Sequence, residues 1–132
     1  MKKSEIFPLV MLVLGAIGFA LFGVKWLVNP TGMATPLGII LTNGDATSDA
    51  RAVYGGMELG LGLFLAYSAI APARRTQGLA AAAITLAGLG VSRSIGIIAA
   101  ESVTSGTYAL LATDLTGTVL CIAAFLVSRK ND

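Results

Sequence analysis

Long apolar runs separated by short polar segments dominate the chain, and each run is about as long as a membrane-spanning helix. A helix needs about 20 predominantly apolar residues to cross the hydrocarbon layer of a bilayer. Runs of this length cover residues 6–28, 51–71, 78–100 and 108–127. The pattern therefore predicts an all-α integral membrane protein, in which residues 1–132 form a single transmembrane domain, a bundle of four helices.

The polar segments between the runs predict the connections. Residues 29–50 are rich in turn-forming residues around a short apolar centre, so we expect a long loop that packs on the helix ends, with Asp49 as the N-cap of the second span. Pro72 ends that span before a tight basic turn. Trp26, near the end of the first run, is typical of an aromatic anchor at the membrane surface.

Composition supports a membrane protein and excludes several kinds of site. Only 12% of the residues are charged and 55% are hydrophobic, whereas an average soluble domain has about 25% charged residues. The chain has no histidine and one cysteine, Cys121, so the usual zinc, haem and iron–sulfur ligand sets cannot be assembled within it. We expect no metal and no cofactor. Because histidine is also the commonest general base, its absence favours a non-catalytic protein.

Charge indicates the orientation and the class of partner. The basic residues at the segment ends are Lys2, Lys3, Arg74, Arg75, Arg129 and Lys130. All of them fall on one side if four helices alternate in direction, and positively charged segments stay in the cytoplasm. We therefore expect both termini to be cytoplasmic and the long loop to face outward. The net charge of +2 is too small to indicate nucleic acid, so the expected partners are the lipid bilayer and either another membrane protein or further copies of the chain.

Three charged side chains interrupt the later apolar runs: Glu58, Arg93 and Asp114. Each lies roughly 10 Å along its helix from the predicted outer end, at 1.5 Å per residue. An isolated ionised group at such a depth costs on the order of 2.5–3.5 kcal/mol, and pairing offsets much of that cost. The coincidence of depth predicts that the three side chains form one polar cluster facing the interior of the bundle.

Arg51 and Tyr54 precede Glu58 at near-helical spacing and are predicted to extend this cluster toward the outer mouth of a cleft. Two interpretations of the cluster stay open. Buried ion networks often have a structural role, in which they fix helix register and partner choice. Perturbed carboxylates in clefts also mark functional sites, and in that case the cluster binds a small ligand, an ion or a lipid headgroup.

Small residues recur at four-residue spacing in two of the spans. Gly56 and Gly60 form a G-x-x-x-G pair in the second span, and Gly88, Ser92 and Gly96 form a similar ladder in the third. Small residues at this spacing let two helices approach closely in a membrane. We predict that these faces pack against other helices, either within the bundle or in another copy of the chain.

The opening of the second span, Arg51-Ala-Val-Tyr54-Gly55-Gly56, is followed in the third span by the arginine of Val91-Ser92-Arg93-Ser94-Ile95-Gly96. With these two motifs the chain resembles a family of small bacterial four-span membrane proteins catalogued as domain of unknown function 4345. The resemblance covers nearly the whole chain and implies a four-helix protein of the bacterial inner membrane. It brings no activity, so no catalytic residues are assigned.

The favoured function is that of a non-catalytic accessory or interaction subunit, whose polar cluster of Glu58, Arg93 and Asp114 binds a small ligand or a lipid headgroup. One alternative is a small oligomeric transporter or channel subunit. The other is a membrane enzyme acting on a lipid or quinone, in which a carboxylate of the cluster is the base and the arginine holds an anion.

Overall fold

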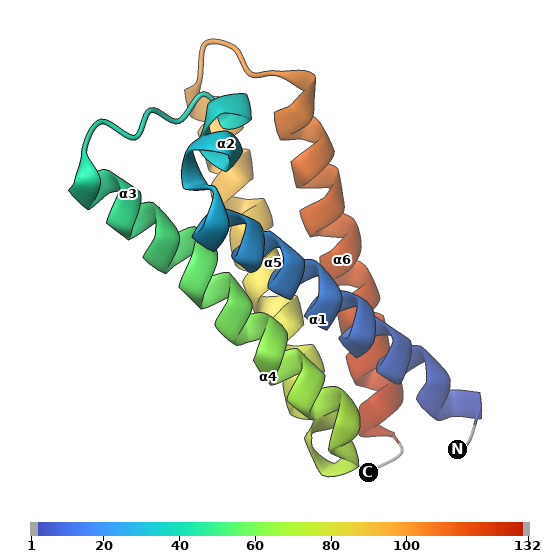
Figure 1. Cartoon of the computed structure of the whole chain (residues 1–132). Helices are drawn as coiled ribbons and strands as arrows, with labels where there is room; N and C mark the ends of the chain where they lie inside the picture. The colour runs from blue at the N-terminus through green and yellow to red at the C-terminus, as the bar shows by residue number, and fades with distance from the viewer. Residues whose placement is uncertain (1–2, 131–132) are drawn as a thin grey trace.

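The computed structural model of the chain describes residues 3–130, in which helices dominate and no strand occurs (Figure 1). The α-helices are α1 (Lys3–Val28), α2 (Pro30–Ala34), α3 (Gly44–Ala50), α4 (Glu58–Ile70), α5 (Arg75–Ala99) and α6 (Ser105–Arg129). A π-helical segment, η2 (Arg51–Met57), joins α3 to α4 without a break. Short 3-10 turns, η1 (Thr35–Leu37) and η3 (Pro72–Arg74), follow α2 and precede α5.

Four helical stretches are long and apolar enough to cross a membrane, which confirms the predicted all-α, four-helix membrane fold. They cover Glu5–Val28, Gly44–Ile70, Pro72–Ala99 and Ser105–Arg129. The long helices begin and end close to the predicted boundaries, with one exception. The second begins at Gly44 instead of at residue 51, because α3, η2 and α4 are continuous.

The early start of this helix makes the predicted N-cap wrong. The side chain of Asn43 accepts a hydrogen bond of 2.9 Å from the backbone N–H of Ala46, so Asn43 is the N-cap. Asp49 lies inside α3. The polar segment before the apolar run is therefore helical, and the connection after α1 shortens to residues 29–43. Within it, α2 and η1 lead into the apolar centre at residues 37–41, of which Ile39 and Leu41 pack against buried residues near the end of α1.

The long helices form two antiparallel pairs (Figure 1). α1 packs along α4, and α5 packs along α6. The pairs meet where α1 packs on α6 and α5 and where α4 packs on α5. At one end of the bundle, Arg75 forms an ion pair with Glu5 at 3.8 Å, and the hydroxyl oxygens of Thr76 and Ser128 are 2.9 Å apart. We call this the basic end, and the opposite end, with α2 and residues 100–104, the loop end.

Apolar side chains fill the half of the bundle nearest the basic end. The buried members of this core are Leu12, Ala16, Leu65, Ala69, Leu79, Ala82, Ala83, Cys121 and Ala124. They come from all four long helices, so this half is where the two helix pairs are held together. The Cys121 thiol is a buried member of the core, as expected for a small apolar side chain.

Trp26 belongs to a second, smaller apolar cluster at the loop end, and the prediction that it anchors the protein at the membrane surface is wrong. Its indole is fully buried beside Ala34 and Ala50. The segment after α1 folds back, and Met33 packs against the same cluster. The ring of Tyr54 stacks on the indole with 4.6 Å between the ring centroids. The returning chain therefore covers a side chain that the sequence placed at the headgroups.

Glycines make the closest approach between α1 and the second long helix. A Cβ atom added at Gly62 would lie 2.6 Å from the backbone nitrogen of Ala20, and one at Gly23 would lie 2.6 Å from the backbone nitrogen of Leu59. Both distances are too short for any side chain. These two positions therefore let the backbones of α1 and α4 come into direct contact.

The small residues that were predicted from the sequence to pack are not these glycines. The prediction that they pack against other helices within the bundle is wrong. All five predicted positions are exposed: Gly56, Gly60, Gly88, Ser92 and Gly96. A Cβ at Gly60, Gly88 or Gly96 would meet nothing within 4 Å. The four-residue spacing is correct for a helix face, but these faces point outward because the rotation of each helix is set by its neighbours. Packing against another copy of the chain stays a prediction.

Candidate functional site

An ion pair between Arg93 and Asp114 links α5 to α6. The Arg93 Nε donates to Asp114 Oδ2 at 2.8 Å. The Asp114 side chain is only 9% exposed, whereas that of Arg93 is 27% exposed. Gly90, one turn before Arg93, packs against the same part of α6, where a Cβ would lie 3.1 Å from the Leu115 side chain. The pair is short and well shielded, and its charges cancel.

Glu58 is the first residue of α4 and is 8% exposed. Its carboxylate makes no hydrogen bond or ion pair with any residue in the range 3–130. The structure thus joins two members of the predicted cluster, Asp114 and Arg93, and leaves Glu58 without a hydrogen bond or ion pair to either of them.

Arg51 and Tyr54 have another role than the predicted one of lining a cleft with Glu58. The Arg51 Nε donates a hydrogen bond of 3.1 Å to the carbonyl oxygen of Leu27, which caps the C-terminal end of α1. Tyr54 stacks on Trp26, near the same end of α1. Both side chains therefore hold the second long helix against the first.

The π-helical segment explains why the side chains of Arg51 and Tyr54 point toward α1 and do not share a face with Glu58. The prediction assumed that residues 51, 54 and 58 follow the α-helical repeat of 3.6 residues per turn. In a π-helix the hydrogen bonds run from residue i to i+5, so each turn contains more residues and the faces before and after it are rotated relative to each other. The segment Arg51–Met57 has this geometry. Arg51 and Tyr54 consequently reach α1.

The motif at the opening of the second span has a structural explanation in this segment. Besides Arg51 and Tyr54, it supplies Gly55, which is buried. A Cβ at Gly55 would lie 2.8 Å from the side chain of Leu27 and 3.2 Å from its backbone nitrogen. The motif therefore builds a joint between η2 and α1. Sequence reasoning missed the role of Gly55, although its neighbour Gly56 was singled out.

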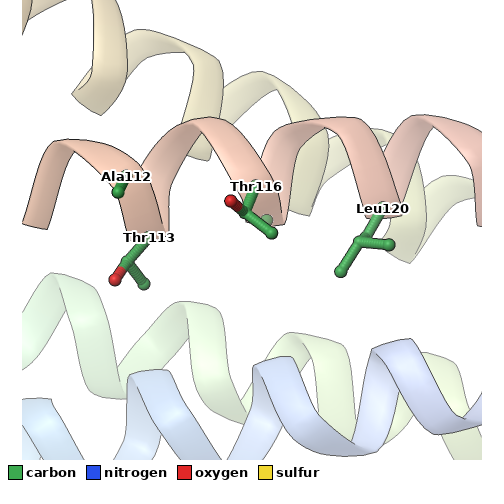
Figure 2. A pocket seen from close by; sticks show the side chains of 5 residues that line it. Ala112, Thr113, Thr116 and Leu120 are labelled. Carbon is green, nitrogen blue, oxygen red and sulfur yellow. The ribbon is translucent and has the colours of Figure 1, made fainter. Parts of the chain in front are cut away.

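An open groove of about 430 Å³ lies along α6. Its lining residues are Ala112, Thr113, Thr116, Gly117 and Leu120. Figure 2 shows the side chains of Thr113, Thr116 and Leu120 directed from α6 toward the ribbons of α1 and α4. All five lining residues belong to α6, and Glu58, Arg93 and Asp114 are not among them. Methyl and methylene groups dominate this lining, and two threonine hydroxyls interrupt it.

The chemistry available here is recognition of charge in an apolar setting. The Arg93 guanidinium is engaged by Asp114, whereas the carboxylate of Glu58, a largely buried residue, has no such counterion. A cation beside such a carboxylate would offset the cost of burying an isolated charge.

Comparisons with known proteins identify the family to which the chain belongs and nothing further. A comparison with curated proteins found no match, and neither did a comparison with solved structures. The sequence profile of one family does match, over residues 9–125, which is most of the chain and includes all three members of the charged cluster. The resemblance seen in the two motifs is thereby confirmed, and the chain belongs to the family described as domain of unknown function DUF4345.

Proposed function

We propose that this protein is a non-catalytic accessory subunit of the bacterial inner membrane that binds a small ligand or a lipid headgroup at Glu58, Arg93 and Asp114. The observation that carries the proposal is Glu58, a residue only 8% exposed whose carboxylate has no hydrogen-bonding or ionic partner among residues 3–130. A purely structural ion network would satisfy its members, because an unpaired charge in such a place destabilises the fold. A binding site is instead completed by its ligand.

The shape of the bundle supports a binding site over a conduction path. The charged cluster and the groove lie toward the loop end, whereas the half nearest the basic end is filled by the apolar core that includes Leu12, Leu65 and Leu79. These three leucines are at most 1% exposed. The proposed site is therefore closed on one side by packed side chains.

The proposed orientation places the site near the outer surface of the membrane. Arg74 and Arg129 lie at the basic end, together with the start of α1. Positively charged segments of short loops stay in the cytoplasm. We therefore assign the basic end to the cytoplasm and the loop end, with the site below it, to the outside.

Native mass spectrometry of gently extracted protein tests the proposed function. The wild type is expected to carry a discrete adduct that is missing from Glu58→Gln and from Arg93→Ala. Glu101→Gln is the matched control, because Glu101 is an exposed carboxylate in the connection before α6 and lies outside the cluster. If no adduct depends on Glu58 while the subunit count changes in both cluster variants, the charges are architectural and the proposal is wrong.

A further inference from the structure

The basic end of the bundle carries a concentration of positive charge that the proposed function does not use. Among the residues whose side chains the structure describes, four basic residues lie at this end, together with one acidic residue, Glu5. We call the four basic residues the basic cluster: Arg74, Arg75, Arg129 and Lys130. Four positive charges and one negative charge leave a net charge of +3, so this end attracts anions.

Contacts between helices bring the members of the basic cluster together. The hydroxyl oxygens of Thr76 and Ser128 are 2.9 Å apart and hold the start of α5 against the end of α6. Arg75 directly precedes Thr76, and Arg129 directly follows Ser128. The start of α1 joins them, because Arg75 NH1 lies 3.8 Å from Glu5 Oε2. The positive charges of α5 and α6 therefore gather at one place.

Arg75 is the member of the cluster whose hydrogen bonds the protein leaves unmade. Its side chain is only 16% exposed, and its Nε is buried without a hydrogen-bonding partner among residues 3–130. The distance of 3.8 Å to Glu5 is too long for a hydrogen bond. A guanidinium has several N–H donors, and shielding it from water without acceptors costs free energy. An anion that accepts hydrogen bonds from the exposed part of Arg75 would offset this cost.

The position of the cluster relative to the membrane indicates what carries this anion. One membrane-spanning stretch begins at Glu5, the next ends at Ile70, and the last ends at Arg129. The basic cluster therefore lies at the level of the lipid headgroups. Exposed apolar side chains near the same end, including Phe7, Ile70 and Leu126, continue along the outside of the bundle. A phospholipid would thus meet the cluster with its phosphate and these side chains with its acyl chains.

We propose that the basic end binds the phosphate of an anionic phospholipid, with Arg75 as the main contact and the other three members of the basic cluster adding positive charge. Phosphate oxygens match the planar donor set of a guanidinium, and basic residues beside a membrane attract anionic lipids. A free phosphate would gain the charge but not the apolar contacts. This site lies at the opposite end of the bundle from Glu58, Arg93 and Asp114, so it stands or fails independently of the proposed function.

The test uses the full chain in a neutral detergent, with bound lipids counted by native mass spectrometry. The probes are phosphatidylglycerol, zwitterionic phosphatidylcholine, and glycerol 3-phosphate as a phosphate without acyl chains. We expect phosphatidylglycerol to bind the wild type more tightly than the other two probes do. Arg75→Gln should bind it at least about tenfold more weakly, because a hydrogen bond to a charged group is lost.

Lys25→Gln is the matched control. It removes the same charge from an exposed side chain in the last turn of α1, at the loop end. Lys25→Gln should therefore bind phosphatidylglycerol as the wild type does. Glu58→Gln should also bind it unchanged, which separates this site from the one in the proposed function.

A second variant decides the question if Arg75→Gln fails to fold. The double variant Arg129→Gln with Lys130→Gln changes only exposed side chains and should weaken phosphatidylglycerol binding at least about fivefold. Unchanged binding in the folded variants would overturn the proposal. Equal loss in Lys25→Gln would reduce the effect to net charge, equally tight binding of phosphatidylcholine would remove the need for an anionic lipid, and equally tight binding of glycerol 3-phosphate would exclude a site for lipid. Each of these results would overturn the proposal as well.

Discussion

The contact between α1 and α4 allows a sharp test of the packing, because two glycines on one helix have opposite surroundings. A methyl group added at Gly62 would lie 2.6 Å from the backbone nitrogen of Ala20 and 3.0 Å from the carbonyl oxygen of Ala16. A methyl group added at Gly60 would meet nothing within 4 Å. The substitutions Gly62→Ala and Gly60→Ala are chemically identical, so their difference isolates the contact.

The size of the effect follows from these distances. Contacts become ordinary at 3.4 Å, so the two helices must separate by about 0.8 Å at Gly62. The obstructing atoms belong to the backbone and cannot rotate away. Overpacking of this kind costs about 1–3 kcal/mol, and a shift of the whole helix would also loosen the packing of Gly23 against Leu59. Gly60→Ala should instead stabilise α4 by about 0.5–1 kcal/mol, because alanine has the higher helix propensity.

Reversible unfolding in mixed detergent micelles, followed by circular dichroism, measures both variants against the wild type. We expect Gly62→Ala to unfold at a lower denaturant fraction than the wild type and Gly60→Ala at an equal or higher one. The reasoning is refuted if Gly62→Ala is as stable as Gly60→Ala, since α1 and α4 would then not be in backbone contact at this position.

Three further predictions use other contacts. Arg93→Ala should destabilise the protein by about 3 kcal/mol, because it leaves the buried Asp114 carboxylate unpaired. Adding Asp114→Asn should restore part of this loss in the same unfolding assay. A double variant that is no more stable than Arg93→Ala would contradict the ion pair. Tyr54→Ala should lower the free energy of unfolding by about 0.5–1.5 kcal/mol beyond the effect of the lost buried area. It should also shift the fluorescence emission of Trp26, the single tryptophan, to longer wavelength. An unchanged emission maximum would rule out the stacking of Tyr54 on Trp26. Asn43→Ala should lower the free energy of unfolding by about 1 kcal/mol, because it removes the N-cap of α3. The amide hydrogens in the first turn of α3 should then exchange faster. Unchanged exchange would place the start of the helix elsewhere.

Much of the architecture could be predicted from the sequence. The apolar runs are long enough to identify membrane helices, and the proline at residue 72 and the polar turns mark most of their ends. The common depth of Glu58, Arg93 and Asp114 followed from counting residues along alternating helices. The structure joins the last two in an ion pair and buries most of the first. Depth is predictable because the rise per residue of a helix is constant.

The rotation of each helix could not be predicted in this way. In a soluble bundle the polar face of a helix shows which side is outside, but a membrane helix is apolar all round because lipid replaces water as its surroundings. Gly56 and Gly60 therefore looked as suitable for packing as Gly55 and Gly62. Only the second two lie against α1.

The sequence by itself thus determined the number of spans, their approximate lengths and the depth of the buried charges, because these depend on hydrophobicity and on the regular rise of a helix. Only the tertiary structure decided which faces meet, since that choice depends on contacts between distant residues. The π-helical segment Arg51–Met57 is the clearest case. It directs Arg51 and Tyr54 to the end of α1, away from the face that they were predicted to share with Glu58, a rotation that no local pattern of residues specifies.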